Sequence, residues 1–139
     1  MNEEHYLIDE PELTPTQLEV FRRFLFFSVP EAAAAVAGVS EQAWRRWEAG
    51  TRKIPTEVSE RMHEILAWRK ATVLSLTGAL NRLPINEVMT LPWYESAEDW
   101  AQAEKENPAL WRVYQSACAE LANRWNDRID FEIYKGPDT

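Results

Sequence analysis

Cysteine and histidine are scarce in this chain: its 139 residues include one cysteine, Cys118, and two histidines. A lone cysteine cannot form an internal disulfide, and Cys118 shares no metal-ligand spacing with the histidines. Aspartate, glutamate and tyrosine are scattered, so no nucleophile, base and orienting group share a motif. We therefore expect no metal, no other cofactor and no enzymatic activity.

Long hydrophobic runs are also missing. No stretch approaches the ~18 apolar residues that a membrane-spanning helix needs. The first ten residues, MNEEHYLIDE, are acidic, whereas a secretory leader is basic and then apolar. We expect a cytoplasmic protein with no membrane partner. The 45% of hydrophobic residues supply enough material for a packed core.

Positive charge is scarce overall, since the formal net charge is -8. Residues 1–12 hold five acidic and no basic residues, residues 13–82 hold ten basic and seven acidic, and residues 83–139 hold five basic and eleven acidic. This balance argues against indiscriminate phosphate binding. It leaves open a focused nucleic-acid face in the middle segment, or a surface charge that only keeps the protein soluble.

Two helices are predicted at the start of the middle segment. The sequence TPTQ at residues 14–17 has the pattern of a capped helix start, and apolar spacing continues to about residue 27. Ser28 and Glu31 form a second capping box, which opens a helix to about residue 37. In the first helix, the apolar residues expected to face inward are Leu18, Phe21, Phe24, Leu25 and Phe26.

Two further helices follow a glycine turn. Gly38 can adopt a positive φ, and Ser40 can cap a short third helix that ends at Gly50. A long helix is predicted over residues 56–81, where apolar residues recur at spacings of three and four. The helix, turn, short helix and basic exit loop of residues 28–55 form the layout of a helix-turn-helix.

The pattern changes after Leu83. Residues 85–94 favour an extended segment, and two helices are predicted over residues 96–105 and from about residue 108 to residue 125. Residues 128–134 alternate polar and apolar side chains, which predicts a strand. We expect this strand to pair either with the extended segment or with its own copy in a second subunit.

The third helix is predicted to have two sides with different roles. At about 100° of rotation per residue, Ala43, Trp44 and Trp47 face the interior and the other side is polar. Arginine can bind guanine, glutamine can bind adenine, and glutamate can accept from cytosine. Because the first turns of such a helix enter the major groove, the predicted base-reading residues are Glu41, Gln42, Arg45 and Arg46.

Residues near the helix ends are predicted to hold the DNA backbone, which sets position without carrying sequence information. These predicted phosphate contacts are Ser28, Ser40, Thr51, Arg52 and Lys53. Simpler roles stay open for some of these polar residues. Ser28 can act as a helix cap only, and Glu41 and Arg45, four residues apart, can form an exposed ion pair.

The central segment resembles the lambda-repressor-like or XRE family of helix-turn-helix regulators. The resemblance rests on Ser28, Ala33, Val39, Ser40, Pro55 and the run Trp47-Glu48-Ala49-Gly50. A wider resemblance, from Phe21 to about Leu121, is to YdiL-like regulators, which are relatives of anti-CRISPR-associated autorepressors. It rests on residues 30–33, 39–40, 44, 47–48, 91–94 and 111–116.

These resemblances imply a repressor that binds an inverted repeat as a homodimer, with the C-terminal part joining the subunits; some relatives also bind RNA. The XRE pattern implies that Glu48 pairs with an arginine of the first helix, for which Arg22 is the first choice and Arg23 the second. The segment from Ser28 to Gly38 is one residue longer than in the shortest XRE members. We therefore expect a longer turn before the third helix.

The C-terminal part carries a broad apolar stripe on its last helix and further aromatic residues nearby. This surface can form a small core of its own or continue across a subunit interface. We favour the interface because a single helix-turn-helix buries too little DNA surface to be specific. The predicted dimer-interface residues are Trp93, Trp111, Tyr114, Cys118, Leu121, Trp125 and Phe131.

The sequence thus predicts a mainly α fold. An acidic arm (1–12) precedes a lambda-repressor-like helix-turn-helix bundle (13–82), and a small α+β dimerisation domain follows (83–139). The predicted function is a sequence-specific transcriptional repressor, autoregulatory by resemblance, that binds palindromic double-stranded DNA as a homodimer. The alternative is a protein-interaction module, antitoxin-like or phage-encoded, with secondary nucleic-acid binding, which the acidic ends of the chain support.

Overall fold

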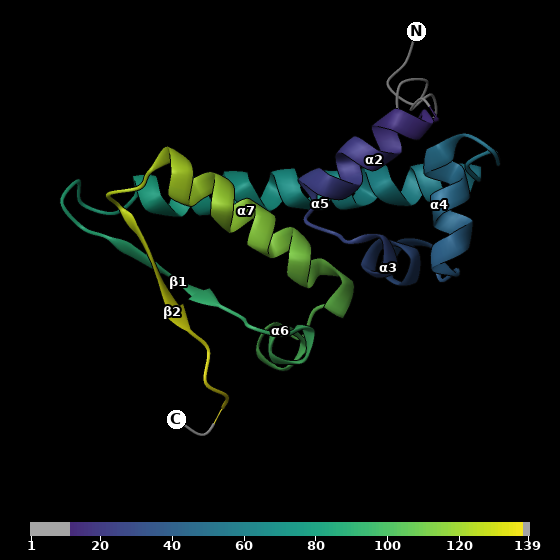
Figure 1. Cartoon of the computed structure of the whole chain (residues 1–139). Helices are drawn as coiled ribbons and strands as arrows, with labels where there is room; N and C mark the ends of the chain where they lie inside the picture. Colours follow the sequence, from purple (N-terminus) through teal and green to yellow (C-terminus); the bar gives the residue numbers. More distant parts are fainter. Residues whose placement is uncertain (1–11, 138–139) are drawn as a thin grey trace, which may run out of the picture. The chain divides into compact units, whose positions relative to one another are not determined.

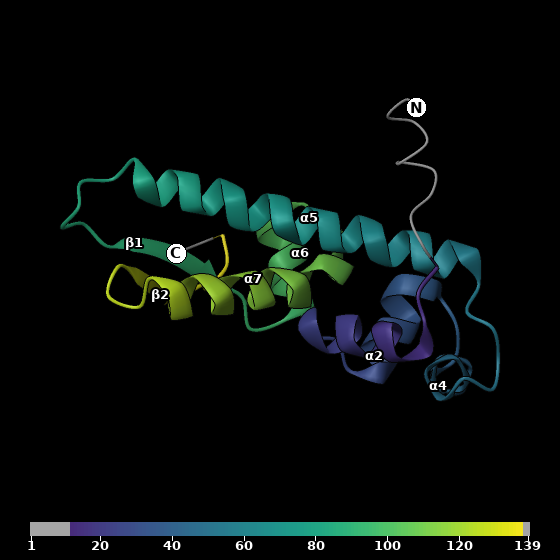
Figure 2. The ribbon, with the colours of Figure 1, turned by 90° about the horizontal axis from the view of Figure 1, so that it is seen from above.

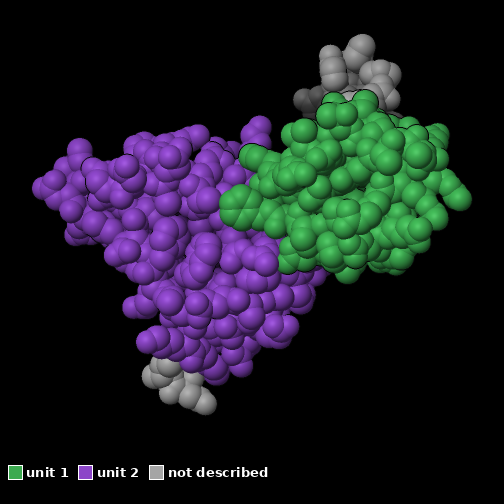
Figure 3. Space-filling view, in the orientation of Figure 1, with its two compact units in different colours: residues 1–64 green, residues 65–139 purple. Residues whose placement is uncertain are grey.

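The computed structural model describes residues 12–137, which are mainly helical with a small two-stranded sheet (Figure 1). The predicted acidic arm therefore lies almost wholly outside the described residues. The chain divides into two compact units, residues 1–64 and 65–139 (Figure 3). The elements in chain order are α2 (Pro15–Phe24), α3 (Val29–Ala32), η1 (Ala33–Ala37), α4 (Glu41–Ala49), α5 (Thr56–Asn81), β1 (Met89–Trp93), α6 (Ala97–Glu104), η2 (Pro108–Leu110), α7 (Trp111–Arg124) and β2 (Ile129–Ile133).

Helix α2 begins as its sequence predicts. The Thr14 hydroxyl accepts from the Gln17 amide, and the Gln17 side chain accepts from the Thr14 amide, which completes a capping box. The helix ends at Phe24, earlier than predicted, and Phe26 adopts a φ of 68°. The backbone reversal at Phe26 turns Phe27 into the core instead, where it is 3% exposed.

The prediction that Phe24 and Phe26 face inward was wrong, because both are 46% exposed. Leu18 and Leu25, from the same predicted set, are fully buried. Phe24 lies in the last turn of α2, and at about 100° per residue it stands about 120° around the helix from Leu18, away from the buried side. Phe26 lies beyond the end of the helix, where the periodicity no longer applies. Helical phase holds only while the backbone stays helical.

The second helix has two parts with different hydrogen-bond patterns. Ser28 and Glu31 form the predicted capping box at the start of α3. The chain then continues as the π-helical turn η1, which Gly38 ends in the left-handed conformation, with a φ of 63°. A π-helical turn is the usual way for a helix to accommodate an additional residue. The segment therefore stays helical up to Ala37, and the left-handed Gly38 follows directly, so the additional residue can be accommodated inside the helix and need not lengthen the turn.

Helix α4 presents one apolar side to the first unit. The Ser40 hydroxyl accepts from the Ala43 amide, as the cap prediction requires, and Gly50 ends the helix with a φ of 79°. Trp44 is fully buried and Trp47 is 8% exposed, with their rings 5.5 Å apart. The predicted inner side of this helix is confirmed for both tryptophans. Ala43 is half-buried.

Helix α5 spans the predicted 56–81 and runs through Gly78 without interruption. The division between the two units falls inside this helix, at 64/65, whereas the sequence placed a domain boundary at 82/83. The physical reason is that the second half of α5 contributes Val73 and Leu80 to the hydrophobic core of the second unit. Arg69 adds hydrogen bonds to Ser116 and an ion pair with Glu120 on α7.

The second unit combines the two strands with α6 and α7 (Figure 2). Strands β1 and β2 pair in parallel, with Met89 opposite Ile129 and Trp93 opposite Ile133. Parallel pairing needs a long crossover, which the intervening helices provide. The first of the two predicted pairings is thus confirmed. No helix of the described part is long and apolar enough to cross a membrane.

Candidate nucleic-acid interface

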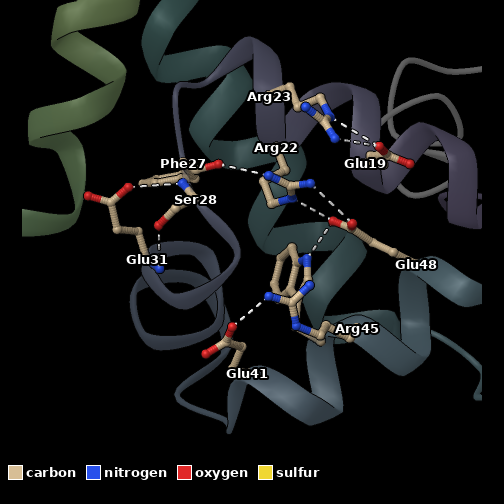
Figure 4. Close-up of polar contacts among 10 residues, drawn as sticks. Glu19, Arg22, Arg23, Phe27, Ser28, Glu31, Glu41, Arg45 and Glu48 are labelled. Carbon is tan, nitrogen blue, oxygen red and sulfur yellow. Dashed lines mark hydrogen bonds and ion pairs between the residues drawn. The ribbon is translucent and has the colours of Figure 1, made fainter.

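A buried ion pair fixes α4 against α2. The carboxylate of Glu48 accepts from Arg22 Nε at 2.7 Å and from Arg22 Nη2 at 3.2 Å (Figure 4). It also accepts from Trp44 Nε1 at 2.7 Å. Arg22 Nη1 donates to the Phe27 carbonyl at 3.0 Å. The side chains of Arg22 and Glu48 are 9% and 12% exposed, so this network closes inside the unit.

Arg22 is the partner that the family resemblance implied for Glu48. The second choice, Arg23, instead forms an exposed pair with Glu19 at 3.0 Å. The bond from Trp44 to Glu48 is a contact that the sequence analysis missed. A tryptophan and a glutamate four residues apart on one helix was the available signal. Trp44 therefore acts both as core and as a donor that holds Glu48 in place.

The four predicted base-reading residues share one exposed face of α4. Glu41, Gln42, Arg45 and Arg46 are all exposed, and they lie opposite Trp44 and Trp47. Glu41 and Arg45 form an ion pair at 2.6 Å with side chains that are 46% and 61% exposed. Among the described residues, the side chains of Gln42 and Arg46 have no ion pair or hydrogen bond. This face is polar, accessible and held by a rigid interior.

The predicted phosphate contacts at the exit of α4 are accessible too. Thr51, Arg52 and Lys53 are exposed and line an open pocket of about 340 Å³ together with Glu12, Leu13, Pro15, Gly50 and Ile54. Within the described part of the chain, Arg52 and Lys53 form no ion pair. Two cations at the end of a polar helix face can attract an anionic backbone.

The three hydroxyl residues of the predicted phosphate set already have structural roles. Ser28 and Ser40 accept from backbone amides at 3.2 Å each, as helix caps. A hydroxyl that accepts in this way keeps its own hydrogen for another acceptor. The Thr51 hydroxyl instead donates to the Arg46 carbonyl at 3.3 Å. Thr51 is therefore less suited to a phosphate contact than the two serines.

The predicted dimer-interface residues fall into two groups. Tyr114, Cys118 and Leu121 lie within the core of the second unit, at 7%, 0% and 0% exposure. They have almost no surface to offer a partner, so their assignment to an interface is corrected. The α7 stripe that the sequence analysis placed at an interface is covered by the chain itself. The residues that keep accessible surface are Trp93, Trp111, Trp125 and Phe131.

Burial raises the pKa of three ionisable side chains in this core, Tyr94, Tyr114 and Cys118. Burial raises the pKa of the Cys118 thiol from 9.0 to about 11, while a hydrogen bond with Tyr114 acts in the opposite direction. Burial, and then a hydrogen bond to Glu104, raise the pKa of Tyr94. No cluster of metal-binding side chains occurs between residues 12 and 137. Tyr94, Tyr114 and Cys118 belong to the hydrophobic core of the second unit.

Comparison with known proteins points to one family. A family model described as Aca2/YdiL-like matches residues 13–129. The chain is similar to the Aca2 repressor of Pectobacterium phage ZF40, with 28% identity over 109 residues that cover 77% of this chain and 90% of the relative. It is also similar to the uncharacterized protein YdiL of Escherichia coli strain K12, with 24% identity over 107 residues that cover 76% and 89% of the two chains.

Proposed function

This chain belongs to the Aca2/YdiL-like family, and from that premise we propose that it is a sequence-specific DNA-binding transcriptional repressor. It binds an inverted-repeat operator as a homodimer, and the family resemblance extends the proposal to regulation of its own gene. The segment α3, η1 and α4 acts as a helix-turn-helix whose second helix enters the major groove. The name of the phage relative, a repressor, agrees with this role.

The observation that carries the proposal is the exposed polar face of α4. Gln42, Arg45 and Arg46 stand at a spacing that can place their side chains against adjacent base edges. Arg52 and Lys53 follow directly and can hold the phosphate backbone. The buried network of Arg22, Glu48 and Trp44 keeps this face in one orientation, which base recognition requires.

The homodimer is the second part of the proposal. A single helix-turn-helix buries too little DNA surface for specific binding, and a two-fold operator requires two such units about 34 Å apart. Accessible apolar surface in the second unit supports pairing there. Trp93 and Phe131 are half-buried with their rings 5.6 Å apart, and Ile133, which lies opposite Trp93 in the sheet, is 47% exposed.

Selection of bound fragments from random DNA by the purified chain tests the proposal. We expect an enriched palindrome, with half-sites one helical turn apart and an affinity that falls steeply with salt. Lys53→Ala should weaken binding to all sequences alike, whereas Lys70→Ala, which removes an exposed cation from the second unit, should have little effect. Enrichment of no sequence would refute the proposal.

The same preparation separates the alternatives. A chain that shifts no DNA but copurifies with another protein would favour the protein-interaction module. RNA added as a competitor would reveal whether a second nucleic acid uses the same face. Sedimentation of the free chain and of its DNA complex would measure the number of subunits. A monomer on the DNA would refute the homodimer.

A further inference from the structure

The two arginines of the α4 face differ in their surroundings. Arg45 Nη2 donates to Glu41 Oε1 at 2.6 Å, one helical turn away (Figure 4). Arg46 has no such partner among the described side chains. The nearest other carboxylate on this helix, Glu48, is taken by Arg22 and Trp44. Glu41 is therefore the one carboxylate of the described face that restrains a predicted base-reading cation.

We propose that Glu41 is a positioning and specificity-determining residue: it holds Arg45 for a guanine instead of contacting a base itself. The inference rests on the proposed function, since it concerns how the α4 face recognises DNA. It also divides the arginines. Arg45 reads a base, whereas Arg46, one of the predicted base-reading residues, is reassigned to a phosphate because no described side chain restrains it.

Donor counting is consistent with this role. A guanidinium has five N–H donors, and the bond to Glu41 uses one of them. Bidentate recognition of guanine O6 and N7 needs two donors, so Arg45 retains enough after Glu41 is bound. A restrained guanidinium also loses less side-chain freedom when it meets its base than a mobile one does.

Charge explains why a carboxylate on this face increases specificity. Glu41 offsets the charge of Arg45, so the pair gains little from approaching a phosphate of any sequence. Glu41 itself is repelled by the backbone unless Arg45 stays beside it. Non-specific complexes, which depend on phosphate contacts, are therefore disfavoured more than the specific one. Discrimination arises partly from weakening the wrong complexes.

The chain provides a matched control for this pair. Glu19 and Arg23 on α2 are also a glutamate and an arginine four residues apart, at 3.0 Å, with side chains that are 43% and 69% exposed. Glu19→Gln removes the same charge from the same kind of pair, on a helix that carries no predicted base-reading residue. A difference between Glu41→Gln and Glu19→Gln therefore reports on the position of the carboxylate and not on net charge.

The test compares affinities for a selected operator and for operators with single base-pair changes, using the full chain. Arg45→Ala should reduce discrimination at one guanine about 5- to 150-fold. Glu41→Gln should reduce discrimination at that same guanine by about two- to fivefold, and Glu19→Gln should leave it unchanged. In the Arg45→Ala background, Glu41→Gln should have no further effect on discrimination at that guanine, although affinity for all sequences should rise because an unpaired carboxylate is removed. Arg46→Ala should lower the slope of log affinity against log salt by about one.

Two results would overturn the inference. The first is equal discrimination by Glu41→Gln and Glu19→Gln. The second is an effect of Glu41→Gln on base discrimination that persists without Arg45, which would show that Glu41 contacts a base directly. A wild-type chain that selects no sequence would instead refute the proposed function, and this inference with it. Side-chain NMR of Arg45 without DNA gives an independent check, because its Nε–H should become more mobile in Glu41→Gln and not in Glu19→Gln.

Discussion

Replacing Glu48 with alanine should severely destabilise the first unit. The change removes the acceptor of two Arg22 donors and of the Trp44 indole. Arg22, whose side chain is 9% exposed, would retain only the Phe27 carbonyl. Removing one partner of a buried ion pair costs about 3–5 kcal/mol, because the remaining charge is left uncompensated. A typical domain has a total stability of only about 5–15 kcal/mol.

Hydrogen exchange measured by mass spectrometry locates this loss. Peptides from α2 and α4 should exchange roughly two to three and a half orders of magnitude faster in Glu48→Ala, since about 1.4 kcal/mol corresponds to a factor of ten. Peptides from α7 in the second unit serve as the internal reference. Glu19→Ala, which breaks the exposed pair with Arg23, should change exchange by less than about threefold.

A double replacement separates the pair from its surroundings. Arg22→Met with Glu48→Leu leaves no buried charge, so it should cost less than Glu48→Ala. It still leaves the Trp44 indole N–H without an acceptor, which costs about 1–3 kcal/mol. The reasoning is refuted if Glu48→Ala exchanges within tenfold of the wild type in α2 and α4, or if the double replacement is the more damaging.

Three further predictions concern the DNA face, a helix end and the core. Gln42→Ala should relax preference at one base pair by about 1–3 kcal/mol, whereas Lys53→Ala should weaken binding to all sequences alike. Binding titrations on operator variants measure this, and the same pattern of affinities for both variants would contradict the prediction. Gly50→Ala should cost about 1–2 kcal/mol, because Gly50 has a φ of 79° and an added Cβ meets only Pro15 at an ordinary 3.6 Å; an unchanged urea midpoint would contradict this. Cys118 should resist alkylation at pH 8 in the folded chain and react after unfolding. Its pKa is raised from 9.0 to about 11, so folding stability should fall as pH rises between these values, and a flat urea profile there would contradict the burial argument.

The helices were predictable because their signals are local. The capping boxes at Thr14 and Ser28, the cap at Ser40 and the left-handed glycine at Gly38 each depend on a few neighbouring residues. Such preferences act within one turn of backbone and need no knowledge of the tertiary fold. The limits of β1 and β2 were narrower than the predicted segments, because the pairing partner decides where a strand ends.

The errors arose where a distant contact decides the outcome. The exposure of Phe26 and the burial of Phe27 depend on how the chain leaves α2. The burial of Cys118 and Leu121 depends on the elements that cover α7. An apolar helix stripe shows that a surface is covered, but it cannot show whether the cover comes from the same chain or from another one. The pairing of Arg22 with Glu48 came from family resemblance and not from spacing.

The candidate site was partly predictable for a similar reason. Burial of Trp44 and Trp47 fixes which side of α4 is polar, so the exposed set follows from helical phase. The restraint of Arg45 by Glu41 was recognisable only as one of two options, and the structure shows the contact formed. The hydrogen bond from Thr51 to the Arg46 carbonyl depends on the conformation of a loop, which no periodicity describes.

The π-helical turn over Ala33–Ala37 has a consequence for comparing related chains. A π-helical turn can hold one more residue than an α-helical turn. Gly38 and the Ser40 cap can then start α4 at the same place. In a chain with one residue fewer here, we expect an ordinary α-helical turn to replace the π-helical one, with the second helix still beginning at the same cap. We therefore expect a one-residue difference in length at this point to change how the helix winds and to leave the residues of α4 in register.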